Sequence, residues 1–158
     1  MLLHIAHKTL ITGPESAGKT TLALQLAADT DSVYVAEYAR AYLTQLDRPY
    51  RQADLDLICA GQLAAEAAMA QRYPRLVCDT GPVVLYVWSL VKYGNVSLMV
   101  QRAVQEMAYT EIILCYPDLP WTPDPLRETP DADERLRLFE KYEKVLKQAA
   151  HTYRVHQH

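Results

Sequence analysis

The sequence has no surplus of positive charge. Its 16 Lys and Arg residues stand against 19 Asp and Glu residues, which gives a net charge of −3 at pH 7. Proteins that bind nucleic acids or anionic membranes usually present a basic surface, because they must neutralise phosphate groups. The composition therefore disfavours a nucleic-acid or membrane partner.

Long hydrophobic runs are also missing from the sequence. The longest uncharged apolar stretch, residues 81–91, is far shorter than the ~20 residues that a membrane-spanning helix needs. Residues 1–8 lack the basic start and the long apolar core of a secretory signal peptide. We therefore expect a cytoplasmic protein without a membrane span.

Cysteines are few and scattered. Cys59, Cys78 and Cys115 form no CxxC pair, which disfavours a zinc site or a redox pair. Two of them, Cys78 and Cys115, lie in short apolar runs, so we expect buried thiols. An odd and unclustered set of cysteines also fits a reducing compartment.

Size and composition predict one folded domain over residues 1–158. Hydrophobic residues make up 50% and charged residues 22%, which are ordinary values for a globular domain. Short apolar runs typical of strands alternate with longer runs of helical period, and this alternation favours a parallel sheet with helices on both faces. The expected strands are 8–12, 32–36, 75–79, 111–115 and 152–155, and the expected helices are 19–28, 37–45, 54–72, 83–93, 96–107 and one after residue 130.

The segment Gly13–Thr20 reads GPESAGKT and fits the pattern GxxxxGK[ST] between an expected strand and an expected helix. Its glycines let the backbone turn tightly, and its N–H groups converge with the positive end of the helix on an anion. Lys19 can reach the β- and γ-phosphates, and the Thr20 hydroxyl can ligate Mg²⁺. The residues expected to hold ATP are Gly13, Pro14, Glu15, Ser16, Ala17, Gly18, Lys19, Thr20 and Thr21.

Two acidic residues follow expected strands next to this loop. Asp79 ends the run 75–79, a position that can hold the metal directly or through water; alternatively, it caps the helix that begins near Pro82. Glu37 follows the run 32–36 and is a candidate base or ligand of a substrate hydroxyl; alternatively, it is an acid that stabilises a helix start. The sequence leaves open which of the two takes a hydroxyl proton.

Residues 116–130, which we call the lid segment, hold five of the nine prolines. Proline this dense forbids a regular helix or an inner strand, so we expect a functional lid in this place. When the lid closes, Arg127 is expected to stabilise the transferred phosphoryl group, with Arg135 as a second candidate. Trp121 can stack on a planar ring or pack under its own loop. Asp131 and Glu134 resemble the capping box of a following helix.

Other classes of nucleotide-binding protein find less support. The sequence has no NKxD guanine motif, residues 79–82 do not fit DxxG, and the chain is too short for most AAA-type motors. A small-molecule kinase has the right size. A nucleoside-monophosphate kinase would need several arginines, for which Arg40, Arg48 and Arg51 are available. The alternative from another class is a regulatory ATPase module without a small-molecule acceptor.

Five segments occur in the order found in one family: residues 13–23 (GPESAGKTTLA), 36–43 (AEYARAYL), 61–66 (GQLAAE), 78–82 (CDTGP) and 118–131 (DLPWTPDPLRETPD). Together they resemble the NadR-type ribosylnicotinamide kinase domain and its stand-alone AAA-like ATPase relatives, from about residue 8 to residue 146. The phosphate loop alone is generic, whereas the second and fifth segments are much more particular to this family.

The resemblance implies a three-layer α/β/α P-loop fold with five parallel strands in the order 2-3-1-4-5. It also implies phosphorylation of the 5′-hydroxyl of nicotinamide riboside to nicotinamide mononucleotide, with ATP and Mg²⁺. Lys19, Glu37, Asp79 and Arg127 would then carry the catalysis, and Thr20 and Asp79 would serve the metal. The implied substrate-binding residues are Glu37, Tyr38, Arg40, Gln62, Trp121 and Asp124.

The sequence departs from this family at two places. Bifunctional members carry Trp directly before the Glu-Tyr pair, where Ala36 stands here, so either Tyr38, Trp88 or Trp121 supplies a stacking ring or the acceptor differs. Relatives also continue past the fifth strand into a loop and a helix that help to hold adenine, whereas this sequence ends at His158. We therefore expect an open adenine pocket and no second nucleotidyltransferase or DNA-binding domain. The oligomeric state stays open.

Overall fold

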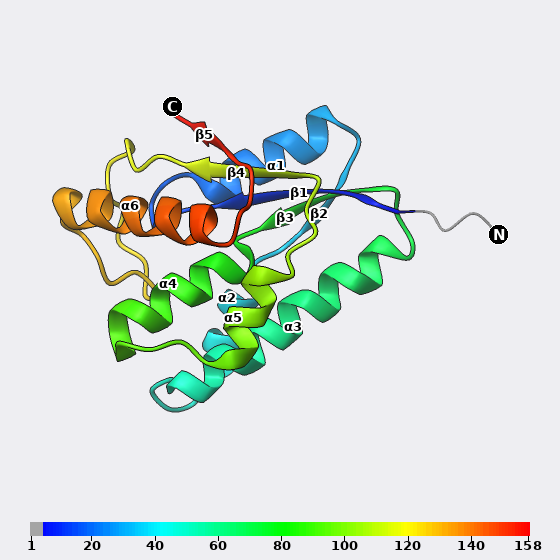
Figure 1. Ribbon diagram of the computed structural model, residues 1–158. Coiled ribbons are helices and arrows are strands. Elements are labelled where there is room, and N and C mark those ends of the chain that lie inside the picture. Colours follow the sequence, from blue (N-terminus) through cyan, green and yellow to red (C-terminus); the bar gives the residue numbers. More distant parts are fainter. Residues whose placement is uncertain (1–4) are drawn as a thin grey trace.

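The computed structural model describes residues 5–158, and one or two helices separate each strand of this part of the chain from the next (Figure 1). The strands are β1 (His7–Thr12), β2 (Val33–Val35), β3 (Arg75–Asp79), β4 (Glu111–Cys115) and β5 (Arg154–His156). The helices are α1 (Lys19–Asp29), α2 (Tyr38–Gln45), α3 (Gln52–Ala70), α4 (Gly81–Tyr93), α5 (Leu98–Gln105) and α6 (Ala132–Gln148). The lid segment contains neither a helix nor a strand.

The five strands form one parallel sheet in the order β2-β3-β1-β4-β5, which confirms the predicted topology. In the pairing of β1 with β3, Ile11 lies opposite Asp79. Because parallel strands end at the same edge of a sheet, the loop that follows β1 lies beside the carboxyl end of β3. This register brings Gly13 and Asp79 together at one edge.

Helices cover both faces of the sheet, as expected. Ile11 and Val77 point to the face on which α1 packs, whereas Leu10 and Leu76 point to the other face, where α4 and α6 pack (Figure 1). This alternation follows from the two-residue period of a strand. The thiols of Cys59, Cys78 and Cys115 are free and buried, as predicted.

The starts of two helices test what the sequence predicted for Asp79 and Asp131. The N-cap of α4 is Thr80, whose φ of 84° is unusual for a residue with a side chain, and the side chain of Asp79 does not cap this helix. At the start of α6, the Asp131 carboxylate accepts a hydrogen bond of 2.8 Å from the backbone N–H of Glu134. The predicted helix start after residue 130 is thus confirmed.

Within residues 5–158, no helix is long and apolar enough to cross a membrane. The expectation that residues 1–8 are not a signal peptide rests partly on residues 1–4, which lie outside the described residues. A cytoplasmic location, a single domain with a lid and the absence of a nucleic-acid partner stay predictions.

Candidate active site

The loop between β1 and α1 bends sharply at three residues. Gly13, Ser16 and Gly18 have φ values of 140°, 54° and 73°. A Cβ atom at Gly13 would lie 2.8 Å from the backbone oxygen of Cys115, so only glycine fits there. The loop leads directly into α1, whose first residue, Lys19, donates a hydrogen bond of 2.7 Å to the backbone oxygen of Pro14. Such a bend before a helix start is suited to an anion.

Asp79 is fully buried beneath this loop, where its carboxylate accepts hydrogen bonds from three hydroxyl groups. Its Oδ2 accepts from Thr20 at 2.7 Å and from Tyr34 at 2.8 Å, and its Oδ1 accepts from Thr80 at 3.0 Å. Burial and the neighbouring Asp79 raise the pKa of the Tyr34 phenol, which therefore stays a donor. Asp79 thus fixes the orientation of the exposed Thr20 side chain.

These oxygen atoms are of the right kind for Mg²⁺. No group of three or more His, Cys, Asp or Glu side chains suited to a metal occurs in the described part of the chain. Mg²⁺ in phosphate-transfer sites is commonly held by one or two protein oxygens, with phosphate oxygens and water as the other ligands. The adjacent Thr20 hydroxyl and Asp79 carboxylate fit this requirement, directly or through water.

Two cavities meet above the loop. The first, which we call the loop cavity, has a volume of about 150 Å³, and the second, the inner cavity, has a volume of about 170 Å³. The loop cavity is lined by Glu15, Ser16, Ala17, Gly18, Lys19, Thr20, Thr21, Glu37, Arg40, Leu126 and Arg127. The inner cavity is lined by Gly13, Pro14, Glu15, Lys19, Glu37, Thr80, Val84, Val87, Trp88, Val91, Lys92, Leu126, Glu128, Thr129, Leu138 and Tyr142. Both cavities share Glu15, Lys19, Glu37 and Leu126.

Glu37 lies at the junction of these cavities, at the N-cap of α2. Burial raises the pKa of its carboxyl group, while the Lys19 ammonium group opposes this rise. Among the described residues, no hydrogen-bond donor contacts the Glu37 carboxylate. The group is therefore available to a ligand, and its pKa is shifted toward neutral pH.

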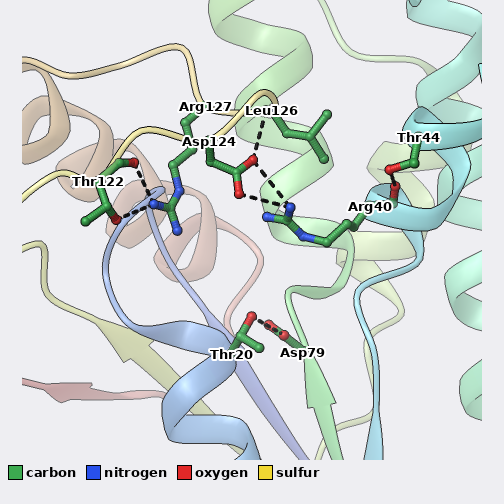
Figure 2. A network of polar contacts seen from close by, with 8 residues as sticks. All are labelled: Thr20, Arg40, Thr44, Asp79, Thr122, Asp124, Leu126 and Arg127. Carbon is green, nitrogen blue, oxygen red and sulfur yellow. Dashed lines mark hydrogen bonds and ion pairs between the residues drawn. The ribbon is translucent and has the colours of Figure 1, made fainter.

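Two arginines reach toward the loop cavity from different elements (Figure 2). Arg40, on α2, binds the Asp124 carboxylate at 3.0 Å, and Arg127 donates to the backbone oxygen of Thr122 at 2.7 Å. Figure 2 shows both guanidinium groups above the pair of Thr20 and Asp79. The backbone N–H of Leu126 and the Arg40 guanidinium group lower the pKa of Asp124. Arg135 instead lies buried on α6 and donates to the Leu119 backbone oxygen at 3.1 Å.

The segment GQLAAE positions the start of α2. Gln62 is buried on α3, and its Oε1 accepts the backbone N–H of Tyr38 at 2.8 Å. Its Nε2 donates to the buried Glu66 at 3.0 Å, which fixes the orientation of the amide. The Tyr38 ring lies against Gly61, where an added Cβ atom would collide with it. Gln62 lines neither cavity, so its substrate-binding role stays a prediction.

Of the three aromatic residues expected to supply a stacking ring, Trp88 is the one that lines the inner cavity. Its indole N–H donates to the Tyr50 hydroxyl at 2.8 Å. The Trp121 indole N–H instead donates to the Glu15 carboxylate at 3.2 Å, and Trp121 lines neither cavity. The roles predicted for these side chains are otherwise untested and stay predictions.

Sequence reasoning missed several residues that the fold brings to the site. A sequence pattern could have found Tyr34, since the alternation along β2 places its side chain opposite to those of Val33 and Val35. No sequence pattern indicates Lys92 or Glu128. They form an ion pair of 3.3 Å between α4 and the lid segment, and Lys92 also contacts Tyr50. Only the packing of distant segments creates this pair.

Comparisons with known proteins bear on the family and the fold. A sequence profile of the AAA_28 family, described as an AAA domain, matches residues 8–157. A comparison with curated protein sequences finds no match.

Several solved structures have a similar fold. The NadR protein in complex with NR has a TM-score of 0.74 and 18% identity, over 96% of this chain and 46% of that one. The NadR protein in complex with NAD and AMP-PNP has a TM-score of 0.76 and 17% identity, over 98% of this chain and 45% of that one. A thymidylate kinase from Ehrlichia chaffeensis has a TM-score of 0.59 and 15% identity, over 95% and 86% of the two chains.

This chain thus spans less than half the length of the NadR chains that it resembles. The predicted resemblance to NadR-type P-loop relatives and the predicted three-layer α/β/α P-loop kinase fold are confirmed. At 15–18% identity, the likeness to the solved structures establishes the fold alone.

Proposed function

Because this chain belongs to the AAA_28 family of AAA domains and has a P-loop kinase fold, we propose that it is a small-molecule kinase with a nucleoside acceptor. One observation carries the proposal: Lys19 and Glu37 line both cavities. A cation suited to phosphate and a carboxylate suited to a hydroxyl group thus face the same junction. Transfer between two ligands requires such an arrangement.

The loop cavity is the proposed site of the ATP phosphates. The loop N–H groups, the start of α1 and Lys19 attract the polyphosphate, and Arg127 lies across the cavity from them. Thr20 and Asp79 would hold Mg²⁺, directly or through water, and the metal would supply positive charge that offsets the charge of the phosphate groups. Lys19 and Arg127 would stabilise the negative charge on the transferred phosphoryl group.

We assign the base to Glu37 rather than to Asp79. The Asp79 carboxylate is fully buried and already accepts three hydroxyl hydrogen bonds, whereas Glu37 faces both cavities. Glu37 takes the proton of the acceptor hydroxyl, the hydroxyl oxygen forms a bond to the γ-phosphorus, and ADP leaves. The raised pKa of Glu37 suits this exchange of a proton.

The cations around the inner cavity favour an acceptor without a phosphate group. Lys19 and Lys92 are its cationic lining residues within the described chain, and Lys92 is paired with Glu128. Arg40 lines the loop cavity rather than the inner cavity, and it is paired with Asp124. Among the described residues that line the inner cavity, Lys19 is thus the one cation without an ion-pair partner, so a nucleoside fits better than a nucleoside monophosphate.

Nicotinamide riboside is the acceptor that we propose first. Its base is a positively charged pyridinium ring, which an aromatic face and carboxylates attract. The inner cavity offers Trp88 for stacking and Glu37 and Glu128 for charge. Trp88 would thereby replace the ring that Ala36 does not supply.

A panel of nucleosides tests the proposal. Purified protein with ATP and Mg²⁺ is expected to form ADP faster with nicotinamide riboside than without an acceptor, and mass spectrometry is expected to show its 5′-phosphate. Faster turnover with another nucleoside would correct the acceptor. If ADP forms at one slow rate whatever nucleoside is added, the kinase proposal fails and a regulatory ATPase module becomes the better account.

Replacing Gly61 by Ala tests whether Tyr38 contributes to the acceptor site. Tyr38 lines neither cavity, but it directly follows Glu37, which lines both. The added methyl group must displace the Tyr38 ring, so we expect the KM for the acceptor to rise about tenfold while the KM for ATP stays unchanged. Steady-state kinetics with each substrate varied in turn measure both constants. The control is the same change in a Tyr38→Ala background, where it should have no further effect. An equal effect in both backgrounds would show that Gly61 acts without Tyr38.

A further inference from the structure

The loop Gly13–Thr20, which we call the phosphate-binding loop, contains an acidic residue that has no role in the proposed reaction. Glu15 lies between Gly13 and Lys19, where a carboxylate aimed at the ligand would repel a polyphosphate. Its side chain instead reaches the lid segment. Oε1 accepts hydrogen bonds from the backbone N–H groups of Glu128, at 3.1 Å, and Thr129, at 2.7 Å. Oε2 accepts the bond from the Trp121 indole at 3.2 Å.

The neighbouring loop residue adds a fourth contact. Ser16 Oγ accepts the backbone N–H of Thr122 at 3.3 Å. The phosphate-binding loop therefore holds the lid segment at two places, residues 121–122 and residues 128–129. Arg127 lies between these places, so both contacts constrain the position of its backbone.

These contacts close one side of the inner cavity. Glu15, Glu128 and Thr129 all line it, as does Leu126 in the same stretch of the lid segment. Water competes with any acceptor hydroxyl for the γ-phosphoryl group, and a kinase limits this reaction by excluding water from the site. Because the lid segment is hydrogen-bonded to the phosphate-binding loop, it lies where it can exclude water from the γ-phosphoryl group.

We propose that Glu15 is a positioning residue that holds the lid segment over the inner cavity and thereby favours transfer to the acceptor over transfer to water. The inference rests on the proposed function. This position requires a carboxylate, because its two oxygens together accept three hydrogen bonds from the lid segment. Glutamine has one acceptor oxygen, and its NH₂ group would face at least one N–H donor.

The variant Glu15→Gln tests this role. We expect the ratio of ATP hydrolysis without an acceptor to phosphoryl transfer with one to rise about tenfold, since hydrogen bonds to a charged group are lost. ADP release and phosphorylated product are measured in parallel. We also expect faster hydrogen exchange at the amides of Glu128 and Thr129, because the neutral amide oxygen of Gln is a weaker acceptor than the charged carboxylate oxygen that both amides share. Trp121→Phe, which removes one of the three donors, should shift the ratio in the same direction by less.

The matched control is Glu140→Gln, which makes the same chemical change at an exposed position on α6 and should leave both readouts unchanged. If exchange at Glu128 and Thr129 stays slow in Glu15→Gln, the contacts do not hold the lid segment and the inference is overturned. It is equally overturned if exchange accelerates while the ratio stays the same. If the wild type phosphorylates no nucleoside, the proposed function fails, and the exchange measurement alone then decides whether Glu15 holds the lid segment.

Discussion

Replacing Glu37 by Gln is expected to lower kcat for phosphoryl transfer by about 10²–10⁴-fold, the usual contribution of a positioned base. Gln is nearly isosteric with Glu but cannot take the proton of the acceptor hydroxyl. The KM for ATP should change little, because the loop and Lys19 stay in place. Steady-state kinetics with saturating ATP and a varied acceptor separate these constants.

The same variant should change the pH dependence of the reaction. Burial raises the pKa of Glu37, and its carboxyl group must be ionised to act as a base. The wild-type rate should therefore fall as pH drops through this raised pKa, and the acidic limb of the pH profile should disappear in Glu37→Gln. A full acidic limb in the variant would assign the titration to another group.

The variant should also be more stable at neutral pH. Below about pH 4, Glu37 is protonated in both the folded and the unfolded chain, so it imposes no penalty. As pH rises toward the raised folded pKa, the unfolded chain loses its proton first, and the stability of the wild type declines. Thermal melts at several pH values should show a higher Tm for Glu37→Gln at pH 7 and a smaller difference near pH 4.

Glu106→Gln is the control for this set, because Glu106 is exposed at the end of α5 and lines neither cavity. It should leave kcat, the pH profile and Tm close to those of the wild type. If Glu37→Gln keeps most of the wild-type kcat, Glu37 is not the base, and Asp79 becomes the candidate for that role.

Replacing Asp79 by Asn is expected to cost both activity and stability. An amide has one acceptor oxygen, so at least one of the hydroxyls of Thr20, Tyr34 and Thr80 loses its partner. Leaving a buried polar group without a partner costs about 1–3 kcal/mol, and each kcal/mol lowers Tm by about 2–4 °C in a protein of this size. Thermal or denaturant unfolding measures this loss.

The activity of Asp79→Asn should fall by about 10–100-fold, the usual effect of removing a carboxylate that orients a metal ligand. The Mg²⁺ concentration that gives the half-maximal rate should rise, because the negative charge of the carboxylate beside Thr20 is lost. The exposed turn residue Asp31 offers a control, since Asp31→Asn removes the same charge far from the site. An unchanged Mg²⁺ dependence in Asp79→Asn would show that Asp79 serves stability alone.

Local sequence patterns sufficed for the strands and helices and for the phosphate-binding loop. The run from Lys8 to Thr20 contains a strand, two glycines at positions of positive φ and a helix start, and each depends on residues next to one another. The order of the sheet followed from the family resemblance, and the position of Asp79 followed from its place at the end of a strand. These features need no knowledge of distant contacts.

Other parts of the candidate site depend on residues that are far apart in the chain. The sequence could not indicate that Gln62 binds the backbone of Tyr38 or that Lys92 pairs with Glu128. It offered three aromatic candidates for a stacking ring but could not indicate that Trp88 is the one that lines the inner cavity. Glu15 occupies a variable position of the pattern GxxxxGK[ST], so the pattern assigns it no role. The three groups that donate hydrogen bonds to its carboxylate belong to the lid segment, more than 100 residues away.

The sequence by itself determined where the chain makes the tight bend that we propose holds phosphate, because glycine and lysine at fixed spacing act over a single turn. The tertiary structure decided which side chains share a cavity with that bend. Helix packing and the path of the proline-rich lid segment set those neighbours, and both result from the burial of many apolar groups at once rather than from any short pattern.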